Sequence, residues 1–195
     1  MSQNKKIAVL FPGIGYTCDK PLLYYAGKLA AGEGYTVIPV KYGNFPSNVK
    51  GNAVKMHECF LSALEQTEEI LKDVDWKEYK DILFISKSVG TVVSSAFAEK
   101  KGISVRSILF TPVNETFDFA GKNAIAFHGT ADPWAADEEV ERGCEILSIP
   151  LHVTEEANHS LETGDVERDL QNMLKTMKIV KKYIKKTSSG GCTCY

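Results

Sequence analysis

The sequence has no long apolar run and no marked excess of charge of either sign. A membrane-spanning helix needs ~20 predominantly apolar residues, and no segment of the chain reaches that length, so we expect no membrane partner. Lys and Arg number 23 against 25 Asp and Glu, a formal net charge of −2, and this balance does not favour a nucleic-acid partner. The first residues, MSQNKKIAVLF, lack the apolar stretch and small-residue cleavage site of a signal peptide, which predicts a cytoplasmic protein.

Cysteine and histidine are also scarce. The five cysteines are irregularly spaced, and without a secretion signal this spacing predicts reduced thiols. Cys192 and Cys194 lie in residues 187–195, whose Ser and Gly content is typical of a flexible tail. The four histidines show none of the spacings of metal-binding motifs, so the sequence predicts no metal and no cofactor.

The sequence does contain a regular alternation of short apolar segments with longer amphipathic ones. Near-continuous apolar strands are typical of a parallel sheet that is buried on both faces. The amphipathic segments between them carry apolar residues at helical spacing, so the pattern predicts an α/β fold with a mostly parallel central sheet and helices on both faces. We expect one domain over residues 1–186. The expected strands are residues 6–11, 35–40, 81–86, 107–110, 123–128 and 150–153.

The segment ISKSVGT, residues 85–91, joins an apolar strand directly to a helical pattern. A strand, a tight turn and a helix with serine on the turn residue make a nucleophile elbow, usually written G-x-S-x-G. Here Ser86 replaces the first glycine, and its small side chain is compatible with close packing of strand and helix. The segment therefore marks Ser88 as a candidate nucleophile, although a plain loop with a serine N-cap would explain it equally well.

A serine nucleophile needs a base, and the base needs an acid that orients it. Asp132 follows the strand at residues 123–128, and His159 lies in the loop after the last strand. Ser88, Asp132 and His159 thus follow three strand ends in the chain order that accompanies this elbow. His128 is the alternative base, but its place at a strand end favours a packed, structural role.

Four segments resemble the signature segments of the α/β-hydrolase superfamily: FPGIGY, SKSVGT, HGTADPW and NHSLE. The resemblance extends from Lys6 to about Lys182. It implies a minimal α/β-hydrolase fold and serine-hydrolase chemistry through a Ser-Asp-His triad without a cofactor, and it leaves the substrate open. Residues 111–122 are too few for a lid domain, and an uncapped site favours a small acyl ester or thioester as the substrate. By position, the resemblance places the oxyanion hole at the backbone N–H groups of Ile14 and Val89, with Gly15 or Tyr16 as alternatives to the first.

The wall of the expected pocket is less well defined by the sequence. Its candidate lining residues are Gly15, Tyr16, Lys87 and Trp134, with Phe117 as a further aromatic candidate. Lys87 is expected to point away from the pocket, which leaves a Ser-Lys mechanism as a minor alternative, and the polar loop at residues 42–53 is expected to border the site. The altered elbow keeps open a non-catalytic binding or scaffold protein of the same fold. The oligomeric state stays open.

Overall fold

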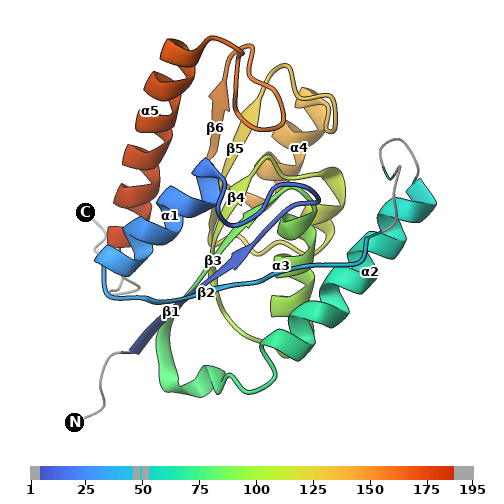
Figure 1. The fold of residues 1–195 in the computed structure, drawn as a ribbon, viewed down its shortest axis with the longest axis vertical. Coiled ribbons are helices and arrows are strands. Elements are labelled where there is room, and N and C mark those ends of the chain that lie inside the picture. The colour runs from blue at the N-terminus through green and yellow to red at the C-terminus, as the bar shows by residue number, and fades with distance from the viewer. Residues whose placement is uncertain (1–4, 46–48, 50–52, 187–195) are drawn as a thin grey trace.

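The computed structural model describes residues 5–45, 49 and 53–186; the expected tail at 187–195 lies outside them. Six strands form one sheet in the order β2-β1-β3-β4-β5-β6, and every neighbouring pair is parallel (Figure 1). The expected α/β fold is confirmed, and the sheet is wholly rather than mostly parallel. The strands are β1 (Lys5–Phe11), β2 (Thr36–Pro39), β3 (Tyr79–Lys87), β4 (Arg106–Phe110), β5 (Ala124–Gly129) and β6 (Leu151–Thr154).

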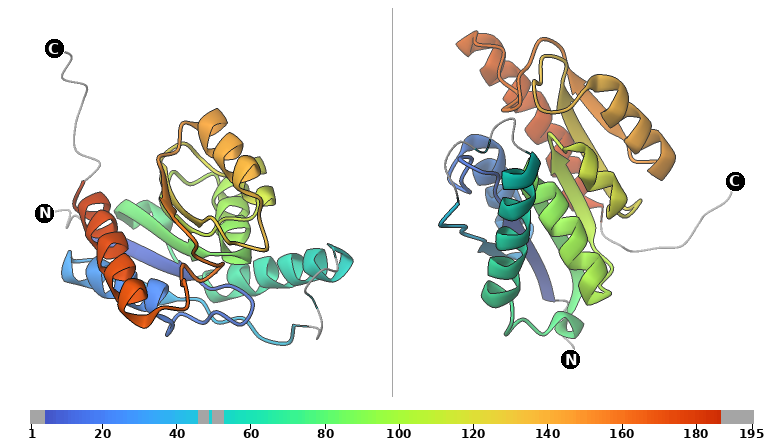
Figure 2. Two further views of the ribbon diagram at one scale, coloured as in Figure 1. Left: turned by 90° about the horizontal axis from the view of Figure 1, so that it is seen from above. Right: turned by 90° about the vertical axis from the view of Figure 1, so that its right-hand side faces the viewer.

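Helices connect the strands and cover both faces of the sheet. The helices are α1 (Pro21–Gly32), α2 (Ala53–Ile70), α3 (Val89–Lys101), α4 (Asp137–Leu147) and α5 (Val166–Lys185), and two short 3₁₀ turns are η1 (Trp76–Glu78) and η2 (Asn114–Asp118). α1 and α5 pack against each other on one face, and α2, α3 and α4 lie on the other (Figure 2). Among the described helices, none combines the length and the apolar character needed to cross a membrane.

The alternation of side chains along β3 shows how the sheet divides the core. Leu83 and Ile85 pack in the cluster that includes α1 and α5, whereas Ile82 and Phe84 pack in the cluster that includes α2 and α3. Successive side chains of a strand point to opposite faces, so both faces of β3 are apolar and both are buried. This arrangement makes β3 a rigid support for the residues that follow its C-terminal end.

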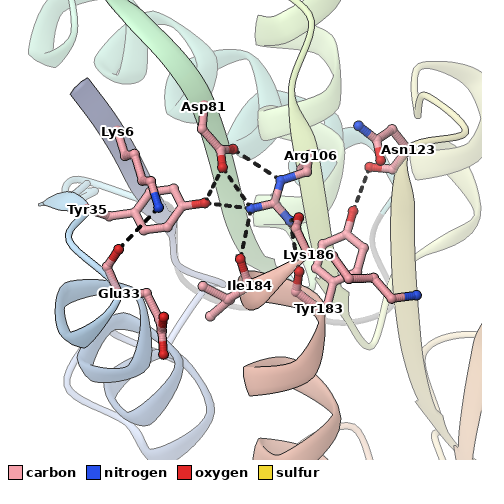
Figure 3. A network of polar contacts seen from close by, with 9 residues as sticks. All are labelled: Lys6, Glu33, Tyr35, Asp81, Arg106, Asn123, Tyr183, Ile184 and Lys186. Carbon is pink, nitrogen blue, oxygen red and sulfur yellow. Dashed lines mark hydrogen bonds and ion pairs between the residues drawn. The ribbon is translucent and has the colours of Figure 1, made fainter. Parts of the chain in front are cut away.

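A buried polar network lies at the N-terminal ends of the strands, away from the C-terminal end of β3 (Figure 3). The Arg106 guanidinium donates through Nε to Asp81 Oδ1 at 3.1 Å and through Nη1 to the carbonyl oxygens of Tyr183 and Lys186 at 2.8 and 2.7 Å. The Tyr35 hydroxyl donates to the other Asp81 oxygen, Oδ2, at 2.5 Å. Carbonyl groups at a helix C-terminus lack intrahelical partners, so Arg106 satisfies the end of α5 and ties it to β3.

We expect Arg106→Met to lower the free energy of unfolding by about 3–5 kcal/mol, because it leaves the Asp81 carboxylate buried without its cation. Urea denaturation followed by circular dichroism measures this change. The matched control is Lys5→Met, which removes the exposed ion pair with Glu78 and should leave the unfolding midpoint almost unchanged. Equal midpoints for the two variants would contradict the importance that we assign to the Arg106 network.

Candidate active site

Ser88 occupies a strained turn between β3 and α3. Its φ is 56° and its ψ is −129°, a conformation that a residue with a Cβ rarely adopts. The turn is held on both sides, since the Ser88 N–H donates to the Phe110 carbonyl oxygen at 3.0 Å and the Thr91 hydroxyl donates to the Ser88 carbonyl oxygen at 2.6 Å. The positive φ that a nucleophile elbow requires is therefore present.

The elbow depends on the absence of a side chain at Gly90. A Cβ at this position would lie 2.4 Å from the Phe11 carbonyl oxygen and 2.5 Å from that of Pro12, so α3 could not begin so close to the end of β1. Ser86, which stands where the usual motif has its first glycine, is fully buried. Its hydroxyl donates to the Ile108 carbonyl oxygen at 3.3 Å, so its polar atom is satisfied within the sheet.

We expect Gly90→Ala to destabilise the protein and to remove most of its reactivity at Ser88, because the new methyl group must displace α3 from β1. Thermal unfolding measures the first effect, and labelling by a fluorophosphonate measures the second. Gly32→Ala is the matched control, since a Cβ there meets no atom within 4 Å and should be neutral or slightly stabilising. A Gly90→Ala protein with full stability and labelling would show that the close approach is not required.

Ser88, His159 and Asp132 form one chain of hydrogen bonds. The distance from Ser88 Oγ to His159 Nε2 is 2.7 Å, and that from His159 Nδ1 to Asp132 Oδ2 is 2.6 Å. With Nδ1 donating to the carboxylate, Nε2 is left as an acceptor for the serine hydroxyl. The loops that carry Asp132 and His159 are joined directly, since the Ala131 N–H donates to the Ala157 carbonyl oxygen at 2.9 Å.

Burial and the neighbours of His159 favour its neutral form. The pKa of His159 is lowered from the usual 6.5 mainly by burial, and the charge of Lys87 lowers it further, while the hydrogen bond to Asp132 opposes the shift. Trp134 stacks on the imidazole with ring centroids 5.5 Å apart, and the backbone N–H of Trp134 donates to Asp132 Oδ1 at 2.8 Å. His159 is thus held as an unprotonated base near neutral pH.

His128, the alternative base, is hydrogen bonded to Asp137, whereas the imidazole bonded to Ser88 is that of His159. His128 is 1% exposed, and its Nε2 lies 2.7 Å from Asp137 Oδ1 at the start of α4. Its Nδ1 lies 3.9 Å from Asp132 Oδ2 and has no hydrogen-bond partner among the described residues. His128 therefore packs behind the carboxylate, in the position of a structural residue.

The loop after β1 approaches the elbow closely. A Cβ on Gly13 would lie 3.1 Å from that of Ser88, and a tight turn from Gly13 to Tyr16 is closed by backbone hydrogen bonds in both directions. Ile14, in this turn, and Val89, after the serine, both line the cavity that reaches Ser88. In the described part of the chain neither of their N–H groups has a hydrogen-bond acceptor, so both are available to a ligand.

A cavity of about 720 Å³ opens beside Ser88 and His159. Its wall is mostly apolar, with Glu115 and Asp118 of η2 as its acidic members. Trp134 and Lys87, both expected at the wall, line it. The Lys87 side chain is buried, and strand alternation places it on the face of the sheet that carries α1 and α5. Val49 comes from the loop expected to border the site, although most of residues 46–52 lie outside the described part. The other lining residues are Ile14, Met56, His57, Phe60, Val89, Val92, Val113 and Phe119.

Three expected lining residues lie elsewhere. Tyr16 is 8% exposed and packs in the core under α1, where its hydroxyl accepts a hydrogen bond from the Leu22 N–H at 3.0 Å. Gly15 has a φ of 75° in the turn and does not line the cavity. Phe117 turns toward α4, since its ring fills the space that a side chain at Gly143 would need. These three expectations are corrected by the packing of the loops beneath the site.

Sequence reasoning missed the contribution of α2. Met56, His57 and Phe60 line the cavity, and Phe60 stacks with Phe119 at 6.4 Å between ring centroids. Their helical spacing was the available signal, but that spacing also describes an ordinary core-facing stripe. Among the described residues, no group of His, Cys, Asp and Glu side chains could hold a metal ion.

Comparison with known proteins identifies the fold. No protein-family model and no curated protein matches the sequence. The structure is similar to Est1E from Butyrivibrio proteoclasticus, at 11% identity and a TM-score of 0.68, with 95% of this chain and 89% of that chain covered. It is also similar to the Pyrococcus furiosus esterase Pf2001, at 17% identity and a TM-score of 0.65, with 97% and 86% covered.

A third neighbour is an alpha-beta serine hydrolase homologue from Coxiella burnetii, at 15% identity and a TM-score of 0.64, with 92% of this chain and 85% of that chain covered. Similarities at identities this low support the same architecture but do not indicate the same substrate. The sheet order, the elbow after β3 and these neighbours together show that the chain has the α/β-hydrolase fold.

Proposed function

We propose that the protein is a serine hydrolase that cleaves a small acyl ester or thioester through an acyl-enzyme intermediate. The observation that carries this proposal is the chain of two short hydrogen bonds from Ser88 through His159 to Asp132. A serine on a strained elbow, a neutral imidazole and a buried carboxylate are the parts that nucleophilic acyl transfer requires. The esterases among the structural neighbours agree with this chemistry.

The geometry supports a two-step reaction. His159 Nε2 takes the Ser88 proton as Oγ attacks the carbonyl carbon, and Asp132 stabilises the imidazolium that forms. The N–H groups of Ile14 and Val89 donate to the oxyanion of the tetrahedral intermediate. Collapse of this intermediate expels the alcohol or thiol, which takes the proton from His159. Water, activated by the same imidazole, then attacks the acyl-enzyme and releases the acid and Ser88.

The cavity supports an uncharged acyl group of short or medium length. Its wall is largely apolar, and two carboxylates, Glu115 and Asp118, stand at η2, so a substrate that carries its own carboxylate would be repelled. The segment between β4 and β5 holds only η2 and adds no lid. A site without a lid in this segment favours small esters and thioesters over deeply buried lipids.

We expect Ser88→Ala to abolish covalent labelling by a fluorophosphonate and hydrolysis of p-nitrophenyl acetate, because Oγ is the attacking atom. Ser86→Ala is the matched control and should retain labelling, since Ser86 is buried in the sheet. His159→Gln should reduce turnover on the order of 10³-fold or more, whereas His128→Gln should spare most of it. Labelling that persists in Ser88→Ala, or a wild-type protein that neither labels nor turns over any short ester or thioester, would leave the non-catalytic binding protein as the better account.

We expect Val113→Phe to shorten the acyl chains that the site accepts. Val113 lines the cavity just before η2, and a phenyl ring there occupies space that a longer chain needs. The ratio of kcat/KM for hexanoyl over acetyl p-nitrophenyl esters should fall by about 10-fold or more. Val153→Phe, on the exposed face of β6, is the control and should leave the ratio unchanged. An unchanged ratio in Val113→Phe would place the acyl group elsewhere.

A further inference from the structure

Lys87, directly before the nucleophile, is buried. Its side chain is 2% exposed and ranks among the largest fully buried side chains of the protein. A lysine is rarely buried this completely unless its charge is compensated. The alternation along β3 places Lys87 on the same face as Leu83 and Ile85, toward α1 and α5.

The surroundings of the Lys87 ammonium compensate its charge only in part. Nζ lies 5.0 Å from the centroid of the Tyr16 ring, a distance at which a cation is attracted to the aromatic face. Asp132 and Glu162 favour the charged form, yet no carboxylate of the described residues forms an ion pair with Nζ within 4.0 Å. Burial dominates and lowers the pKa of Lys87 to about 7. Burial of a cation with so little compensation lowers the stability of the fold, and a role in the chemistry of the site would account for its presence.

We propose that Lys87 is a positioning residue whose positive charge, held behind Ser88, keeps His159 in its neutral, proton-accepting form. The inference rests on the proposed function, because it concerns the base of that reaction. Lys87 does not serve as the base itself, since His159 Nε2 already holds Ser88 Oγ at 2.7 Å. The lysine acts instead on the imidazole through the electrostatic field of the site.

Several other charged groups act on His159 and Lys87. His159 faces Asp132, which favours its protonation, and Lys87 and His128, which oppose it. Lys87 faces Asp132 and Glu162, and Lys20 lies 6.0 Å from the same Tyr16 ring.

Three more charged groups lie at the edge of this set. Asp137 hydrogen bonds to His128, and Glu115 and Asp118 line the cavity. Of all these groups, Lys87 is the one cation among the described residues that is both fully buried and directly joined in sequence to the nucleophile.

The sign of the effect follows from these contacts. His159 must be neutral to accept the Ser88 proton, so reactivity rises as the pH increases through the pKa of His159. The pKa of His159 is lowered from 6.5 and that of Lys87 is lowered to about 7, so the ammonium is the predominant form of Lys87 where His159 gains its proton. Removing the Lys87 charge eases protonation of His159, and the acid limb should move to higher pH.

The test compares Lys87→Met and Lys87→Gln with Lys87→Arg. The pH dependence of the rate of fluorophosphonate labelling locates the acid limb, and NMR titration of the imidazole gives the pKa of His159 directly. We expect the two neutral variants to raise both midpoints by about half a unit or more, and Lys87→Arg, which keeps the charge, to restore the wild-type values. Lys80→Met, an exposed lysine at the start of the same strand, is the matched control and should shift neither.

The proposal is overturned if folded Lys87→Met and Lys87→Gln proteins keep the wild-type midpoints, or if Lys80→Met shifts them equally. A wild-type His159 whose pKa is 6.5 or above would overturn it even if every variant at position 87 failed to fold. The NMR titration does not depend on turnover. Failure of the proposed hydrolase activity, seen as absent labelling of the wild type, is therefore distinguished from failure of the role of Lys87.

Discussion

The contact between Gly90 and the backbone at the end of β1 is the constraint on which the rest of the site depends. Because no Cβ intervenes, α3 begins against the carbonyl groups of Phe11 and Pro12, and Ser88 is forced into its positive φ. The same approach brings Gly13 next to Ser88. Nucleophile and the proposed oxyanion donors are therefore positioned by one backbone contact, before any substrate arrives. Such preorganisation is what electrostatic catalysis requires.

The two ends of the parallel strands have different roles: the N-terminal ends stabilise the fold, and the C-terminal ends carry the candidate reactive residues. At the N-terminal ends of the strands, Arg106 donates to Asp81 and to the carbonyl groups at the end of α5 (Figure 3), and a satisfied buried network of this kind rigidifies a fold. At the C-terminal ends of the strands, the strained Ser88 lines the cavity together with Ile14 and Val89. The backbone strain at Ser88 persists because the sheet that supports it is apolar and buried on both faces.

The fold and the order of the candidate triad could be predicted because each depends on a local pattern. Apolar strands, amphipathic helices and turn residues are written in short segments, and Ser88, Asp132 and His159 each follow such a strand. The wall of the cavity could not be predicted in the same way. Adjacency to the site does not say which way a side chain turns: Tyr16 turns into the core under α1, while Phe60, on a helix whose later turns pack in the core, lines the cavity.

The direction of the Lys87 side chain could not be predicted from its place beside Ser88 either. Its charge bears on the burial of the Asp132 carboxylate. The side chain of Asp132 is 0% exposed, and a buried carboxylate is costly unless its surroundings compensate it. Two hydrogen bonds, from Trp134 and His159, satisfy its oxygens, but neither neutral donor supplies a full positive charge. The Lys87 ammonium supplies this charge when it is protonated, and among the described residues it does so without an ion pair to Asp132 within 4.0 Å. A direct ion pair would compete with His159 for Asp132, so a lysine set back against Tyr16 compensates the carboxylate without disturbing the orientation of the base.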